Sequence, residues 1–406
     1  MADLADDVLP LIRTRADLHT WRASNAHGAQ MHEGVDLLRE AADQGNPAEA
    51  FAVTQKALAS ALKVIMRADD SSGIIGDAVR DLLDLHADLS GPAAPPPAKL
   101  VDWMIKFQFH NDCDFFTLDP VRYAPALGDV GMARYRRRLD EIRAGLEPLP
   151  DDWRTSFRHE LFTLDHNDRR LAVLDRDADA VIRTHARDQR VAAWLDDTAK
   201  ALAEIDEYDR AIDWAQRATE FDRGHQSLTA SETWCALVAA HRPDELLATR
   251  LAVFRRFPSS STAARLYDTA GDDWDSLQDE VTTTLNTRPR DAVLFSLNTL
   301  RDPRRAWAQA HDLSLTDGAL WLDLIKKYEK IDRLAVLGPL TDLVYAELET
   351  AGAGHYQAAA RHLVRMRRLA NGTDRAHEVD TFIVQLRDIH RNRPRLQQEF
   401  DRAGLR

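Results

Sequence analysis

Apolar side chains recur every three or four positions along most of the chain, which is the spacing of one face of an α-helix. One such stretch begins at Val35. It is interrupted at residues 43–47 (DQGNP), and the same spacing resumes over residues 48–65. Two helices joined by a short Gly/Pro turn form an αα-hairpin. The pattern therefore predicts an all-α fold built from antiparallel helix hairpins.

Three further hairpins are predicted at residues 192–204 with 208–221, 231–240 with 244–257, and 262–270 with 274–285. Their period of roughly 34 to 40 residues is that of tetratricopeptide-like (TPR-like) repeats. The match is partial, because Ala211, Ala215 and Ala218 supply the small residues of a second helix whereas its expected aromatic residue is missing. A single hairpin buries only part of its apolar surface, so neighbouring hairpins must stack. We therefore expect a TPR-like α-solenoid.

These patterns divide the chain into four predicted parts. They are a helical or irregular segment at 1–34 with a loop at 24–28 (SNAHG), a helical region at 35–150, TPR-like repeats at 151–350, and a basic helical cap at 351–406. Further helices are predicted at 291–300, 304–311, 316–329, 334–350, 354–371 and 375–392.

A proline-rich stretch at 91–97 (GPAAPPP) interrupts the second part. Consecutive prolines favour an extended conformation and end the helix before them. The stretch is either a domain boundary or a rigid loop between stacked hairpins. The same helical spacing on both sides favours the loop.

Residues 69–77 (DDSSGIIGD) could be an ion site, a phosphate site or the start of a helix. A calcium loop needs alternating carboxylates and a closing glutamate, and a phosphate loop needs a basic residue after its glycines. Neither pattern is present. We expect a helix start, in which Asp70, Ser71 or Ser72 accepts backbone N–H bonds and Gly73 relaxes the turn that Asp69 begins.

The helix after this turn carries an apolar stripe and an all-acid stripe. The acidic positions are Asp77, Asp81, Asp84 and Asp88. Such a row could hold a divalent cation, but a solvated helix face is the commoner meaning of this pattern. This pattern leaves open a third hypothesis, ranked below a binding scaffold and a nucleic-acid-associated factor. It is a metal-dependent hydrolase built on Asp69, Asp70, Asp77 and Asp81.

Several ordered motifs resemble the helical region that accompanies bacterial SWIM-type zinc fingers, and related finger-less bacterial proteins of unknown function. The motifs are the turn at 69–73, Leu85-His86, Tyr123, Leu127-Gly128, Gly131 and Tyr135, together with the C-terminal stretch from His355 to Leu405. The resemblance covers roughly residues 35–405 and implies an all-helical, repeat-like body. A SWIM finger needs a Cys-x-Cys pair and a later Cys-x-His, and this chain has neither. The resemblance therefore implies no zinc site here.

Composition narrows the class of protein further. The chain of 406 residues is 44% apolar and 29% charged, with a formal net charge of −13. An acidic chain as a whole is a poor coat for nucleic acid or anionic membranes. Its two cysteines, Cys113 and Cys235, cannot form a disulfide framework or a four-cysteine zinc site. With neither a secretory signal nor an apolar run of about 20 residues, we expect a cytoplasmic protein.

Catalytic patterns are few. His159-Glu160 with His166 (HELFTLDH) is not a His-Glu-x-x-His zinc helix, because its histidines are seven residues apart. Cys113 follows His110 by three residues, but the flanking acids would raise the pKa of its thiol, so we expect a structural thiol. We predict no catalytic residue, no metal and no cofactor.

Basic side chains are the remaining candidates for a binding site. Guanidinium groups could contact phosphate or an acidic partner, or could pair with the protein's own carboxylates. The net negative charge favours the second interpretation. The candidate partner-binding residues are Arg136, Arg137, Arg138, Arg361, Arg365, Arg368, Arg387, Arg391 and Arg393.

We expect from these patterns a non-catalytic helical-repeat scaffold that binds a protein or peptide partner. The hairpin period, the many aromatic residues and the lack of a catalytic constellation favour it. The alternative is a nucleic-acid-associated accessory factor of a DNA-processing or defence complex, which would use the arginine-rich C-terminal helices.

Overall fold

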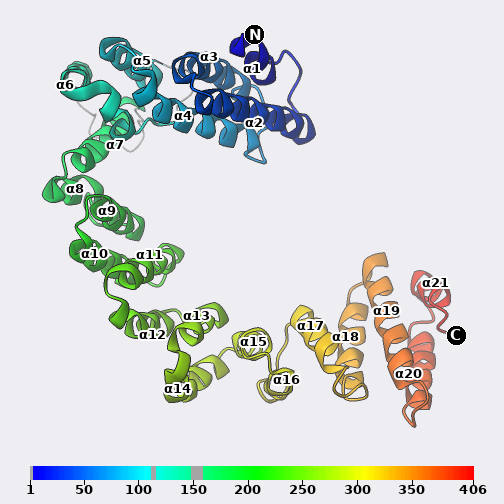
Figure 1. Cartoon of the computed structure of the whole chain (residues 1–406). Helices are drawn as coiled ribbons and strands as arrows, with labels where there is room; N and C mark the ends of the chain where they lie inside the picture. The colour runs from blue at the N-terminus through cyan, green and yellow to red at the C-terminus, as the bar shows by residue number, and fades with distance from the viewer. Residues whose placement is uncertain (1–2, 111–115, 148–158) are drawn as a thin grey trace. The chain divides into compact units, whose positions relative to one another are not determined.

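The computed structural model describes residues 3–110, 116–147 and 159–406, and the regular structure in these ranges is helical (Figure 1). An isolated β-bridge joins Leu18 and Ala68. The all-α prediction is confirmed. The contacts between residues divide the chain into two compact units, Met1–Phe221 (unit 1) and Asp222–Arg406 (unit 2).

Unit 1 is a succession of helices, and the first seven of them share one continuous apolar core. Helices adjacent in sequence contact one another, and α4 also packs against α2 and α6. The core runs from α1 to α7. The helices are α1 Leu4–Ile12, α2 Trp21–Asp43, α3 Pro47–Ile65, α4 Ile74–Ala93, α5 Pro97–Phe109, α6 Pro120–Gly145, α7 His159–Leu174, α8 Ala178–His185, α9 Ala192–Glu204 and α10 Tyr208–Glu220.

Unit 2 has successive local cores, each shared by a few consecutive helices. The helix predicted at 291–300 begins as an α-helix and ends in the π-helical turn Phe295–Thr299. The helices are α11 His225–His241, α12 Leu246–Arg256, α13 Ser260–Ala270, α14 Trp274–Asn286, α15 Pro289–Leu294, α16 Pro303–Asp312, α17 Gly318–Tyr328, α18 Leu337–Glu349, α19 Ala353–Ala370, α20 Ala376–Ile389 and α21 Pro394–Arg402.

Helix starts follow simple capping chemistry. An aspartate or threonine side chain accepts the first free N–H groups, and proline at the first helical position has no N–H to leave unpaired. Asp119 with Pro120 begins α6 in this way, and Asp302 with Pro303 begins α16. The hairpins predicted from residues 192 to 285 are found as α9–α10, α11–α12 and α13–α14, with ends that agree within a few residues except at the start of α11.

The predicted loop at 24–28 is wrong, because these residues lie inside α2, which begins at Trp21 after its cap Thr20. Gly28 is buried against the start of α4. A Cβ atom there would lie 2.6 Å from Cγ2 of Ile74, closer than side-chain atoms approach. The glycine therefore permits close helix packing and does not mark a turn.

The predicted proline-rich loop is shorter than residues 91–97. Helix α4 continues through Pro92 to Ala93, and α5 begins at Pro97, so only residues 94–96 lie between them. Ala94 closes α4 in the left-handed region at φ 45°, and its N–H donates to Ser90 O at 3.1 Å. Pro92 cannot donate a backbone hydrogen bond. It is tolerated because it lies in the last turn of α4, so the helix does not have to continue beyond it.

The residues that carry the sequence motifs build the core of unit 1. Tyr123 and Tyr135 are fully buried on α6. Gly128 kinks this helix at φ 55° and ψ −177°, a conformation that side chains with a Cβ rarely adopt. The motifs are therefore architectural, and they do not by themselves mark a binding site.

Candidate functional site

The predicted helix start at residues 69–73 is confirmed. Both carboxylate oxygens of Asp70 accept backbone N–H groups in the first turn of α4, from Ile75 at 2.9 Å and from Gly76 at 2.8 Å. Asp69 accepts from Ser71 N at 3.3 Å, and Gly73 stands at φ 80° before the helix. The turn is a capping structure.

Replacing Asp70 by alanine is expected to destabilise unit 1 by about 1–2 kcal/mol, because two N–H groups lose a charged acceptor. Hydrogen exchange should accelerate first at Ile75 and Gly76. Asp69→Ala is the matched control, since it removes only one long hydrogen bond. Equal effects of the two substitutions would contradict the assigned role of Asp70.

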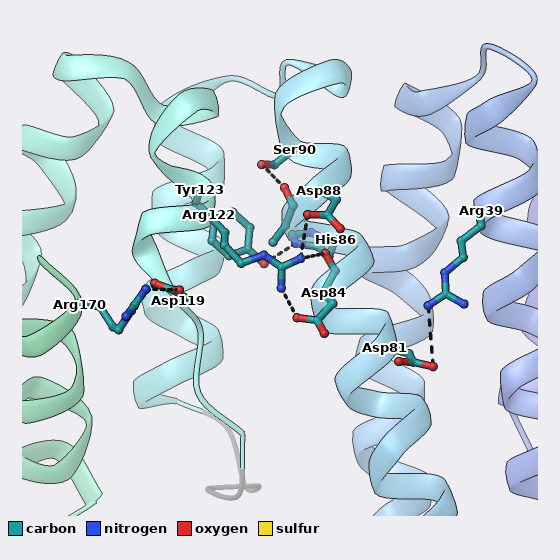
Figure 2. Close-up of polar contacts among 11 residues, drawn as sticks. Arg39, Asp81, Asp84, His86, Asp88, Ser90, Asp119, Arg122, Tyr123 and Arg170 are labelled. Atoms are coloured by element: carbon teal, nitrogen blue, oxygen red, sulfur yellow. Dashed lines mark hydrogen bonds and ion pairs between the residues drawn. The ribbon is translucent and has the colours of Figure 1, made fainter. Parts of the chain in front are cut away.

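The acid stripe of α4 is solvent-exposed, as expected, and its carboxylates also pair with basic side chains (Figure 2). Arg122 of α6 reaches across to Asp84 and, at 2.7 Å, to Asp88. Asp81 lies 3.2 Å from His32 and 3.8 Å from Arg39 of α2, and Asp77 lies 2.6 Å from Arg80. Among the described residues no group of three or more His, Cys, Asp or Glu side chains could hold a metal ion. The stripe joins α4 to its neighbours.

Another ion-pair group lies between α6, α7 and α9. Arg170 is largely buried and donates to Asp119 at 3.0 and 2.9 Å and to Glu204 at 3.0 and 2.8 Å. Burial alone would lower the pKa of the Arg170 guanidinium, but these two carboxylates raise it. Because every carboxylate oxygen of the pair has a partner, this group stabilises the helix packing.

Most of the predicted arginines are engaged by carboxylates of the same unit. The pairs are Arg136–Asp175, Arg137–Glu141, Arg138–Glu141, Arg365–Glu329, Arg368–Glu329, Arg387–Asp401 and Arg391–Asp388. Arg393 donates to Leu348 O at 2.8 Å. Arg361 is exposed and has no ion pair with a described residue. The arginines therefore do not form one free basic face.

The histidines of the HELFTLDH motif point away from a shared site. His159 Nε2 donates to Gln108 O at 2.8 Å, and His166 Nε2 donates to Leu118 O at 3.0 Å. Burial lowers the pKa of His166 and raises that of the buried Cys235 thiol. Cys113 lies outside the described residues, so the structural role expected of its thiol stays a prediction.

A groove between α3 and α5 is the candidate site that the sequence did not reveal. Its volume is about 800 Å³. Its apolar part includes Leu58, Leu62 and Phe107, with Trp103 half-buried and Met66 51% exposed at one end. The polar side chains lining it are Gln55, Lys56, Lys63, Lys106 and His110. No aspartate or glutamate is among the described residues that line it.

The lysines of this groove differ from the arginines elsewhere. Lys56, Lys63 and Lys106 are exposed, and none is joined to a described carboxylate within ion-pair distance. The chain has only eight lysines against 45 arginines, so three of the eight lie in one groove. The groove is therefore a locally positive, apolar surface on an acidic chain.

An aromatic stack holds the walls of the groove in place. His86 of α4 lies between Phe51 of α3 and Trp103 of α5, with ring centroids 4.3 and 4.0 Å away. The Tyr123 hydroxyl lies 3.0 Å from His86 Nδ1. Burial lowers the pKa of His86 to about 3, so the ring is neutral near pH 7. Trp103 thus belongs to both the core and the groove.

The sequence has no dense run of positive charge at this groove. Lys63 and Lys106 come from two helices that only the fold brings together. One local signal was available. Lys56 and Lys63 are seven residues apart, on one face of α3, with Leu58 and Leu62 between them.

The described helices define an all-α protein in which α3 and α5 line an apolar groove edged by lysines. Residues 9–397 match a family of unknown function (DUF6880), and the chain belongs to this family. No curated protein and no solved structure gives a significant match. In the part of the chain that the structure describes, every helix is too short or too polar to cross a membrane.

Proposed function

We propose that the protein is a non-catalytic binding scaffold, and that the groove between α3 and α5 holds an acidic, amphipathic helical segment of a partner protein. One observation carries this proposal. Among the described residues, the apolar groove is lined by three lysines without an ion pair and by no carboxylate, on a chain with a net charge of −13. Such a groove complements a ligand that is apolar on one side and acidic at its edges.

The dimensions of the groove favour a peptide helix over a small anion. The lining residues of α3 run from Gln55 to Met66, which spans about 17 Å of helix, enough for a ligand helix of about 12 residues. Lys56 and Lys63 are separated by about 10 Å along the helix axis. A single carboxylate could satisfy only one of these lysines, whereas carboxylates two helical turns apart could satisfy both.

Charge reversal of the groove is the direct test. The triple variant Lys56→Glu, Lys63→Glu, Lys106→Glu is expected to bind a labelled acidic amphipathic peptide about 50-fold more weakly, because three attractions become repulsions worth about 2.3 kcal/mol together. Fluorescence anisotropy measures the affinity. Salt should weaken binding to the natural chain and have less effect on the variant.

The chain offers a matched control on the same helix. Lys99 of α5 is exposed and does not line the groove, so Lys99→Glu should leave the affinity unchanged. Equal losses in Lys99→Glu and in a single groove variant such as Lys106→Glu would contradict the proposal. Binding of a labelled single-stranded oligonucleotide that Arg361→Glu abolishes would favour the nucleic-acid alternative instead.

A further inference from the structure

We infer that Lys56 and Lys106 act together on one acidic side chain of the partner helix, while Lys63 acts alone on a second one about two helical turns away. This inference rests on the proposed function and names the charge pattern that the partner segment must carry. Three features of the groove carry it: the shared direction of its walls, the levels of the three lysines along those walls, and the lack of a described carboxylate beside them.

The two walls of the groove run in the same direction. Trp103 stacks on His86 across the connection at residues 94–96, and the two residues are nearly equally far from it in sequence. Phe51 stacks on the other side of His86 across the connection at residues 66–73, again from nearly equal distances. Residues equally far from a short connection meet when the two helices run antiparallel. Helices α3 and α5 are therefore both antiparallel to α4 and parallel to each other.

The levels of the lysines follow from the helical rise. Phe51 and Trp103 stack on the same ring, so they mark one level on the two walls. Lys106 is three residues beyond Trp103, about 4.5 Å along α5. Lys56 and Lys63 are five and twelve residues beyond Phe51, about 7.5 and 18 Å along α3. Lys106 is therefore level with Lys56 to within about one helical turn, whereas Lys63 lies more than about two turns beyond it.

The pair Lys56 and Lys106 is suited to a single carboxylate. The two lysines line one groove from opposite walls, both are exposed, and neither is within ion-pair distance of a described carboxylate. A carboxylate has two oxygens, so one acidic side chain can accept N–H groups from both lysines. Two positive charges on one acid attract it more strongly than Lys63 alone attracts the other acid. This level lies inside both helices, where each wall is described.

The partner segment should therefore carry two acidic positions about two helical turns apart, one of which contributes more to binding. Lys56 and Lys63 are seven residues apart on one stripe of α3, and the exposed Ala59 lies between them. Because the alanine side chain is small, an apolar side chain of the partner can pack there between the two acids. The pattern is the same for either direction of the bound helix, so charge and spacing alone define the partner class.

Double-mutant cycles between the full chain and a synthetic peptide test this pairing. The peptide is a labelled amphipathic helix of about 14 residues with two glutamates seven residues apart, and two further peptides replace one or the other glutamate by glutamine. The protein variants Lys56→Met, Lys63→Met and Lys106→Met remove a charge and keep an unbranched side chain. Lys99→Met is the matched control outside the groove. Fluorescence anisotropy measures the affinity of every combination.

The same glutamate should couple to both Lys56 and Lys106. Each of these two substitutions is expected to weaken binding of the parent peptide about 3-fold, and to have no effect once that glutamate is replaced by glutamine. Lys63→Met should couple only to the other glutamate, and Lys99→Met to neither. The inference is overturned if Lys106 couples to the glutamate that Lys63 recognises, or to neither glutamate.

Chemical crosslinking tests the geometry of the lysines without a partner. A short lysine-specific reagent should join Lys56 to Lys106 in the natural chain more often than it joins Lys63 to Lys106, and mass spectrometry identifies the joined residues. Bound peptide should suppress the first of these links, because its carboxylate would lie between the two ammonium groups. An equal or reversed preference between the two links would overturn the inference whatever the peptides do.

Failure of the proposed function looks different. If the parent peptide does not bind, or if none of the three lysine substitutions weakens it, the groove is not the site and both proposals fall. If the lysines contribute to binding but couple to the glutamates in another arrangement, the groove remains the site and only the pairing of Lys56 with Lys106 is wrong. Affinity therefore tests the groove, and the coupling pattern tests the pairing.

Discussion

Replacing Tyr135 by alanine is expected to lower the free energy of unfolding of unit 1 by about 4 kcal/mol, because the substitution leaves a cavity and unpaired polar groups. Tyr135 is fully buried on α6. Its hydroxyl donates to Asn167 Oδ1 at 2.6 Å and accepts from Gln108 Nε2 at 2.7 Å. Asn167 Nδ2 donates in turn to Gln108 Oε1 at 3.0 Å. The three side chains form a closed ring between α5, α6 and α7.

The two parts of this effect can be separated. Tyr135→Phe keeps the ring and removes only the hydroxyl, so a loss of about 1–2 kcal/mol is expected. Phe162→Ala on α7 is the control, since Phe162 is 47% exposed and should cost less than about 0.5 kcal/mol. Urea-dependent hydrogen exchange of α5, α6 and α7 measures each change without requiring both units to unfold together. A full effect of Tyr135→Phe would assign the whole loss to the hydrogen bonds.

Unit 1 is expected to lose stability as the pH falls from 7.5 to 5. Burial lowers the pKa of His86 to about 3, while an unfolded histidine titrates near 6.5. In this range the unfolded chain binds a proton that the folded chain does not, so acid favours unfolding. For His86 the loss is about 2 kcal/mol at pH 5. The lowered pKa values of His166 and His185 act in the same direction.

Substitution of His86 by phenylalanine tests this assignment. The variant keeps a ring between Phe51 and Trp103 but cannot be protonated, so its stability should change less with pH than that of the natural chain. The ion pairs of Arg122 with Asp84 and Asp88 are present in both the natural chain and the variant. The exposed His19 is the control position, and His19→Asn should leave the slope unchanged. An unchanged slope in His86→Phe would remove His86 as the cause.

The sequence predicted helices and hairpins well because their signals are local. Apolar spacing, capping side chains and Gly/Pro breaks act within a few residues, and they located α9 and α10 almost to the residue. The failures at residues 24–28 and 91–97 have a tertiary origin. Gly28 leaves room for the side chain of Ile74 on another helix. Pro92 is tolerated because α4 ends one residue later.

The candidate site was less predictable because it depends on which charges are neutralised. Arg136 belongs to a conspicuous basic run, yet it pairs with Asp175, 39 residues further along the chain. Lys106 is inconspicuous in sequence, yet it lines an apolar groove and has no carboxylate partner among the described residues. Density of charge along a chain therefore indicates little about free charge on the folded surface. The scarcity of lysine was the better signal for the groove, because three of the chain's eight lysines line it.

The position of Trp103 has a thermodynamic consequence. The indole ring of Trp103 stacks on His86 and also forms part of the wall of the groove. A ligand that packs on this ring binds only the folded state, so it must lower the pH at which unit 1 unfolds. Linkage is reciprocal, so protonation that loosens the stack must also weaken the ligand. The groove would then release its partner in acid through protonation of His86, a ring that does not line the groove.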